Sequence, residues 1–196
     1  MFQLVPESTA GPEKGEPAPD ADQRPSVPIG RLGVVLFLAS ETMFFFAIIG
    51  AWITLVNNKP AAIEAVARGL LPHTLSFGLS LVPLAIGSVA CRVFRKDPRK
   101  FALICVIAGI VFIAWRVFVL VQVGQAGYTA RVAVGFAIFY LLTIVHLLHV
   151  AAGTVAAAFR ATGSTSTKLD GLSPFWVHGT LLGAISYAVI FLTMGP

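Results

Sequence analysis

The sequence predicts an all-α membrane protein, a polytopic bundle of about five transmembrane helices. Of the 196 residues, 57% are hydrophobic and only 12% are charged, and the mean hydropathy is +0.84. Soluble domains carry about 25% charged residues, roughly twice this share. A water-soluble fold of this size would have too few polar side chains to cover its surface. Lipid is therefore the expected solvent for most of the chain.

Five stretches are long and apolar enough to cross a bilayer as helices, since a crossing takes about 20 residues. Each is continuously apolar and lacks the alternation of a lipid-facing β-strand, so helices are preferred to barrel strands. The connections between them are polar or rich in turn formers, as at Asn57-Asn58-Lys59-Pro60. The expected spans are 32–56, 70–91, 101–123, 132–159 and 175–194.

The first part of the chain differs from the rest in composition. Residues 1–30 hold six prolines interleaved with Glu, Asp, Gly and Ala. A segment of this kind buries too little apolar surface to offset its ordering entropy. A flexible cytoplasmic tail is therefore expected before the bundle at 31–196.

The basic residues predict the orientation of the bundle. With the N-terminus inside the cell, ten Lys and Arg residues lie in the inner segments and three in the outer ones. The connection between the second and third spans alone holds five basic residues between Arg92 and Lys100. The positive-inside rule thus predicts a cytoplasmic N-terminus and an external C-terminus. Because the net charge of +5 sits in such connections, nucleic acid is not an expected partner.

Five of the ionisable residues inside the expected spans stand out: Glu41, Arg116, His146, His149 and His178. A charged side chain there costs at least about 2.5–3.5 kcal/mol on insertion scales, so each should face the bundle interior and have a partner. At a rise of 1.5 Å per residue, Glu41 and His149 lie roughly 14 Å and 15 Å from the inner ends of their spans, so the two side chains could meet. His146 is one turn away on the same helix face as His149.

Structural and functional roles both remain open for these groups. The buried carboxylate can be protonated and serve as a hydrogen-bond tie between helices. The histidines are expected to be helix–helix hydrogen-bonding groups rather than metal ligands. A bis-histidine haem on His149 with His178 or His73 is an alternative and would make the chain a small b-type cytochrome anchor. A small transporter is a third hypothesis, although discontinuous helices are not evident apart from an expected kink at Pro83.

The sequence carries little catalytic machinery. No phosphate-binding loop, nucleophile triad, haem-attachment motif or carboxylate cluster is present. Cys91 and Cys105 lack metal-type spacing and are expected to be packing residues. Redox-centre ligands are not evident, so the chain is not expected to be an enzyme on its own. Among the tryptophans, Trp52 and Trp176 are expected near the interfaces and Trp115 in the interior.

Two motifs resemble subunit III of the haem–copper respiratory oxidases. Residues 40–45 read Ser-Glu-Thr-Met-Phe-Phe and resemble the family's Ser-Glu-x-x-Phe-Phe signature. Residues 146–153 read His-Leu-Leu-His-Val-Ala-Ala-Gly and are similar to its His-x-x-His-Val-x-x-Gly in the penultimate helix. Order and spacing agree, and the length resembles the short five-helix bacterial form. The resemblance covers the chain from about Arg31 to its end, and together the two motifs are fairly specific.

The chain looks like a divergent member of that family. The family's third helix usually carries a Gln and, three residues later, a Glu. Aligned on Gly109 and Phe112, these positions hold Arg116 and Val119. The family's last helix opens with Tyr-Trp-His-Phe-Val-Asp, whereas residues 175–180 read Phe-Trp-Val-His-Gly-Thr.

The resemblance implies a non-catalytic subunit of a proton-translocating cytochrome c or quinol oxidase in a bacterial-type inner membrane. Such a subunit would pack on the catalytic subunit that holds the haems and copper, bind phospholipid in a cleft and support proton uptake. It would hold no cofactor or metal of its own. Glu41 would be the family's buried carboxylate and His149 its partner. An accessory subunit of a nitric oxide reductase is a related alternative.

Overall fold

The computed structural model describes residues 29–94, 96–163 and 172–194, so the expected tail lies outside the described residues except for its last two positions. Every regular element in this part of the chain is a helix, and five helical stretches are long and apolar enough to span a membrane. The predicted fold class is confirmed. The elements are α1 (Ile29–Asn58), α2 (Pro60–Leu70), η1 (Leu71–His73), α3 (Thr74–Leu79), α4 (Leu81–Val93), α5 (Pro98–Gln125), α6 (Val134–Ala161) and α7 (Leu172–Thr193).

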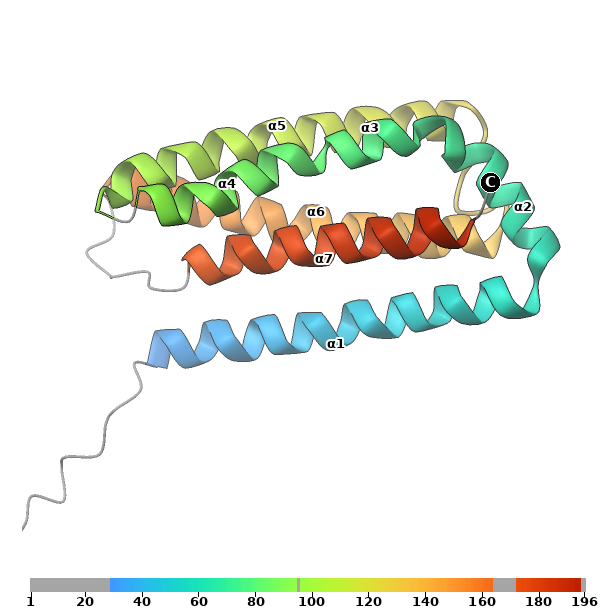
Figure 1. The fold of residues 1–196 in the computed structure, drawn as a ribbon, viewed down its shortest axis with the longest axis horizontal. Helices are drawn as coiled ribbons and strands as arrows, with labels where there is room; N and C mark the ends of the chain where they lie inside the picture. The colour runs from blue at the N-terminus through green and yellow to red at the C-terminus, as the bar shows by residue number, and fades with distance from the viewer. Residues whose placement is uncertain (1–28, 95, 164–171, 195–196) are drawn as a thin grey trace, which may run out of the picture.

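The long helices lie nearly parallel, with α6 and α7 in the middle of the bundle (Figure 1). Helices α4 and α5 cover one side of this central pair, and α1 covers the other. The start of α1 and the connection between α4 and α5 lie at one end of the bundle, and the end of α7 lies at the opposite end. Any group on α1 that faces inward therefore meets α6 and α7.

The helix ends follow from local chemistry. The Asp97 side chain caps α5 by accepting the backbone N–H of Lys100 at 3.1 Å, and Pro98 takes the first helical position, where no N–H is needed. Beyond the C-terminal ends of α5 and α6, Gly127 and Gly163 adopt φ of 88° and 72°. Glycine enters this left-handed region without the steric cost that other residues meet, so the chain can leave each helix in a tight turn.

The second membrane segment begins earlier than expected. The sequence placed its start at residue 70, whereas α2 already begins at Pro60. This short helix is amphipathic, because Ile63, Val66 and Leu70 are buried while Glu64 and Arg68 are exposed. In Figure 1, α2 runs at an angle across the end of the bundle. Such a helix suits the boundary between lipid and water.

A proline interrupts the same segment further along. Helix α3 ends at Leu79 and α4 begins at Leu81. Pro83 has no N–H to donate, and its ring crowds the carbonyl of Leu79, four residues earlier, which breaks the helical ladder there. The Ser80 hydroxyl donates to the Phe77 carbonyl at 2.6 Å in the broken turn. The expected kink is thus a short discontinuity.

Trp115 lies opposite to expectation. Trp52 is only 1% exposed, and its indole N–H donates to the Thr193 hydroxyl at 2.8 Å. Trp176 is also buried, whereas Trp115 is 44% exposed. Successive helix residues point about 100° apart, so a residue next to the buried Arg116 is turned toward the helix flank rather than inward. Being adjacent to an interior residue was therefore poor evidence of burial.

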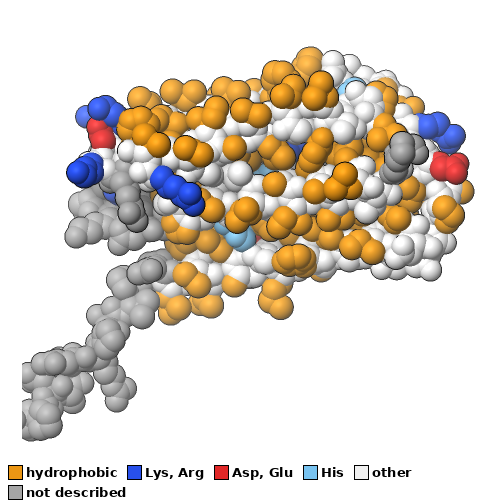
Figure 2. Space-filling model, viewed as in Figure 1, with side chains coloured by type: hydrophobic (Ala, Val, Ile, Leu, Met, Phe, Trp, Pro, Cys, Tyr) orange, Lys and Arg blue, Asp and Glu red, His pale blue; other side chains and the backbone are white. Residues whose placement is uncertain are grey.

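The outer surface of the bundle is apolar along its length, and Lys and Arg side chains gather toward its ends (Figure 2). Met43, Phe44 and Phe46 on α1 are exposed, while Phe45 between them is fully buried. Large exposed side chains of this kind also cover α4, α5 and α6. A soluble protein rarely exposes so continuous an apolar surface, so we assign it to the lipid of a membrane.

Candidate functional site

The structure brings together the two residues that depth arithmetic paired. Glu41 on α1 and His149 on α6 are both buried, and Oε2 of Glu41 lies 2.5 Å from Nδ1 of His149. The contact joins residues 108 positions apart in the chain. It is a direct polar tie between a peripheral helix and the central pair.

Helix α7 completes the surroundings of this pair. Nε2 of His178 lies 3.6 Å from Oε2 of Glu41 and 3.5 Å from the Thr42 hydroxyl. The Phe175 ring stacks on the His149 ring with a centroid separation of 4.0 Å. From the sequence, His178 was an intramembrane polar group and an alternative haem partner of His149, with no predicted contact to Glu41. Thr42 and Phe175 had no predicted role.

Two glycines on α7 make room for the imidazoles. A Cβ placed on Gly179 would come within 2.9 Å of the His149 ring, and one on Gly183 would overlap the His146 ring. Small residues at helix contacts let backbones approach closely in a bilayer. The positions of both histidines therefore depend on small residues on the facing helix.

The Phe175 carbonyl fixes where the proton of the pair can lie. This carbonyl is 3.2 Å from Nε2 of His149, and because it can only accept, Nε2 carries a hydrogen. If the imidazole is neutral, Nδ1 is an acceptor and Glu41 must be a carboxylic acid. If it is an imidazolium, Nδ1 donates to a carboxylate. Either way the pair shares one proton and carries no net charge, which avoids an isolated charge in lipid.

A groove of about 430 Å³ adjoins the pair between α1 and α6. Its lining is mostly apolar apart from the edges of the two site residues and one serine. A volume of this order lies within the range of small-molecule sites and suits an apolar chain. The lining residues are Phe37, Ser40, Glu41, Phe44, Val145, Leu148, His149 and Ala152.

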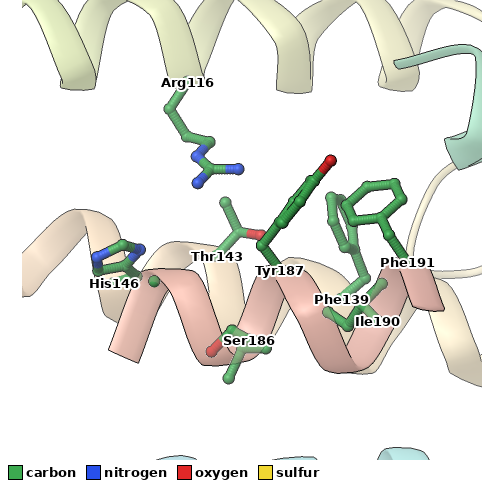
Figure 3. Close-up of a pocket in the computed structure, with 10 residues that line it drawn as sticks. Arg116, Phe139, Thr143, His146, Ser186, Tyr187, Ile190 and Phe191 are labelled. Atoms are coloured by element: carbon green, nitrogen blue, oxygen red, sulfur yellow. The ribbon is translucent and has the colours of Figure 1, made fainter. Parts of the chain in front are cut away.

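His146 and Arg116 form a second polar region, one turn along α6 from the pair. Nε2 of His146 donates to the Gly179 carbonyl at 2.9 Å, so His146 and His149 share one face but have different partners. Arg116 is 6% exposed, and its guanidinium carbon lies 4.9 Å and 5.2 Å from the ring centroids of Phe77 and Phe112. A charged partner was expected for Arg116, but among the described residues none is found. Figure 3 shows its side chain reaching from α5 toward α6 and α7.

The alternative of a haem held between two histidines concerns His149 with His178 or His73. The rings of His149 and His178 lie 5.7 Å apart at their centroids, are tilted by 46°, and both approach Glu41 rather than facing each other across a gap. His73 lies in η1, next to the amphipathic helix. Within the described ranges, no group of three or more His, Cys, Asp or Glu side chains is placed to hold a metal ion.

No known protein-family model and no curated protein matches this chain. The chemistry of the site is therefore judged from its own residues. The pair holds one proton between a carboxyl group and an imidazole beside an apolar groove. They also bind α1 to α6.

Proposed function

We propose that this chain is a non-catalytic, subunit III-like component of a haem–copper terminal oxidase in an aerobic respiratory electron transport chain. In this role it packs on the catalytic subunit, which holds the haems and copper, and on other membrane subunits of the complex. It binds phospholipid and supports proton uptake, and it carries no cofactor of its own.

One observation carries the proposal. The two motifs that resemble the oxidase family lie in different helices, and each contributes one residue to the 2.5 Å contact between Glu41 and His149. Equal depth alone does not require the two helices to be neighbours or the two side chains to face each other. Their meeting at a buried, proton-sharing pair supports the view that both belong to one site.

The groove beside the pair supports the lipid-binding part of the proposal. Phe37 and Phe44 of α1 and Leu148 of α6 offer an apolar wall to an acyl chain. A chain lying there would cover the edge of Glu41 and limit its access to water. Lipid occupancy would thus set how readily the pair exchanges its proton, which fits a supporting role better than an obligatory proton wire.

Composition of the purified complex tests the proposal most directly. The chain, tagged at its C-terminus and isolated in mild detergent from membranes in which it is expressed, should carry with it a large subunit with haem absorption. The chain expressed alone should show no Soret band, whereas a band would favour the cytochrome alternative. Isolation as a colourless chain with no associated membrane subunit would contradict the proposal, and the spectrum and substrate of the associated subunit distinguish an oxidase from a nitric oxide reductase.

Glu41→Gln tests the role of the pair in turnover. We expect the complex to assemble normally, with an initial rate close to that of the parent and a faster loss of activity during sustained turnover, because the pair can no longer exchange a proton. Glu64→Gln is the matched control, since Glu64 is exposed on α2. Equal lifetimes of activity in parent and Glu41→Gln complexes would reduce Glu41 to a structural tie.

A further inference from the structure

The guanidinium of Arg116 lies against a small cavity inside the bundle that is lined by apolar and polar side chains. The cavity has a volume of about 30 Å³ and lies between α5, α6 and α7. One water molecule needs about 10–15 Å³ of such space, so the cavity can hold two waters or one ion of halide size. Figure 3 shows Arg116 above Thr143, with His146 and Tyr187 on either side. The lining residues are Arg116, Phe139, Leu142, Thr143, His146, Gly183, Ser186, Tyr187, Ile190 and Phe191.

Hydrogen-bond donors around this cavity lack acceptors. Nε of Arg116 is buried and has no hydrogen-bond partner, and the same holds for the hydroxyl of Ser186, a residue only 7% exposed. The rings of Phe77 and Phe112 cover the guanidinium and offer it cation–π attraction. They do not accept the N–H groups, which point outward in the guanidinium plane.

The charge of Arg116 also lacks a counter-charge. An arginine stays protonated in a protein, and an uncompensated charge in a bilayer is costly. The described part of the chain has three acidic residues: Glu41 pairs with His149, Glu64 is exposed on α2, and Asp97 pairs with Lys100 in a connection. None of them lines the cavity.

The lining groups match an anion better than a neutral ligand. Arg116 and Ser186 each bring a buried donor without a partner to the lining, and Thr143 adds a hydroxyl. The Tyr187 hydroxyl lies toward Gly78 instead. Nε2 of His146 is already occupied by the Gly179 carbonyl. Water would satisfy some of these donors but would leave the positive charge uncompensated.

We propose that this cavity is a site for a small monovalent inorganic anion of the size of chloride, which acts as the counter-ion of Arg116 and ties α5 to α6 and α7. The site is separate from the Glu41–His149 pair and does not depend on the function proposed above. Polyatomic anions such as gluconate are too large for it.

Thermal unfolding of the purified full chain in detergent tests the site, with chloride replacing gluconate at constant ionic strength. A ligand that binds only the folded state raises Tm, so the parent should show a rise of about 5–10 °C at a hundred times Kd, which grows with the logarithm of the chloride concentration. Arg116→Gln should abolish this rise. Arg131→Gln is the matched control, because Arg131 is exposed in the α5–α6 connection, and it should keep the rise.

Two further measurements keep the proposal testable if Arg116→Gln does not fold. Ser186→Ala should raise the chloride concentration that is needed for the same rise in Tm by roughly tenfold, since one donor is lost. Crystals of the parent grown in bromide should show an anomalous peak in the cavity. A parent Tm that is equal in chloride and gluconate would overturn the proposal, as would a cavity filled only by water or by a carboxylate of a neighbouring subunit. A chloride effect that survives in Arg116→Gln would overturn it as well.

Discussion

The hydrogen bond between Glu41 and His149 determines which replacements the two residues tolerate. In Glu41→Ala, Nδ1 of His149 would stay buried without a partner, at a cost of about 1–3 kcal/mol in the free energy of unfolding. In Glu41→Gln, the side-chain amide can donate to Nδ1 while Nε2 keeps its bond to the Phe175 carbonyl. We therefore expect Tm to fall by several degrees for the alanine variant and to stay near the parent value for glutamine.

Thermal unfolding in one detergent checks this expectation. Ser40→Ala provides a control, because Ser40 is the exposed neighbour of Glu41 and bonds only within its own helix. If the alanine variant were as stable as the glutamine variant, a water molecule would be hydrogen-bonded to Nδ1 of His149. The pair would then not tie α1 to α6.

At the scale of single elements, contact between α5 and α6 depends on a glycine. A Cβ on Gly109 would overlap the side chain of Thr154, whose hydroxyl is bonded to the Val150 carbonyl. Gly109→Ala should therefore force the helices apart and lower the free energy of unfolding by about 1–3 kcal/mol. Gly50→Ala is the matched change on α1, where nothing lies within 4 Å of the new Cβ. It should be neutral or stabilising, because alanine has a better helix propensity than glycine.

The two glycine variants differ only in what surrounds the added methyl group. Tm values measured side by side decide the comparison. Equal destabilisation would show that helix propensity or detergent contact dominates, and that the close α5–α6 approach adds little.

The N-terminal cap of α5 is expected to be pH-dependent. The backbone N–H of Lys100, with help from its ammonium group at 3.1 Å, lowers the pKa of Asp97 below its ordinary value of 3.8. A carboxyl group with a lowered pKa in the folded state stabilises that state fully above pH 3.8, and this contribution is lost as pH falls through the lower folded pKa. Asp97→Ala should thus lower Tm by about 2 °C near neutral pH and by less in acid.

Asp97→Asn separates capping from charge in this experiment. Asparagine caps a helix about as well as aspartate but does not titrate in this range. Its Tm difference from the alanine variant should therefore stay constant with pH. If the difference in Tm between the parent and Asp97→Ala did not shrink in acid, the carboxylate would contribute through its geometry alone.

Elements were predictable from the sequence to the extent that they depend on local composition. Span length and apolarity indicated the five crossings, and the rise per residue placed Glu41 level with His149. The amphipathic α2 was missed because Glu64 and Arg68 suggested a polar connection, although Ile63, Val66 and Leu70 already lie at helical spacing. Comparing the two faces of the segment, rather than its mean polarity, would have predicted this helix.

Lateral neighbours were not predictable in the same way. Hydropathy gives the depth of a residue but not which helices pack side by side, or which way a side chain points. The cavity at Arg116 combines side chains from three helices, with Thr143 on α6 and Ser186 on α7. Nothing in the sequence of its own helix marked either residue as part of a cavity. Trp115 was misplaced for the same reason.

At the scale of the whole molecule, an odd number of spans puts the start of α1 and the end of α7 on opposite sides of the membrane. The start of α1 and the α4–α5 connection share one end, and the α5–α6 connection lies at the other (Figure 1). Arg92, Lys96, Arg99 and Lys100 lie at the first end. The positive-inside rule therefore predicts that this end is cytoplasmic.

Labelling of single cysteines with a membrane-impermeant maleimide tests the orientation in intact cells. Thr129→Cys, exposed in the α5–α6 connection, should react from outside, and Lys96→Cys, exposed in the α4–α5 connection, should react only in inside-out vesicles. The unmodified chain gives the background, because Cys91 and Cys105 lie within α4 and α5. The opposite labelling pattern would place the basic end outside. Because the charge excess at that end is the basis for the assignment, the reversed result would require a partner subunit, rather than the loops of this chain, to set its orientation.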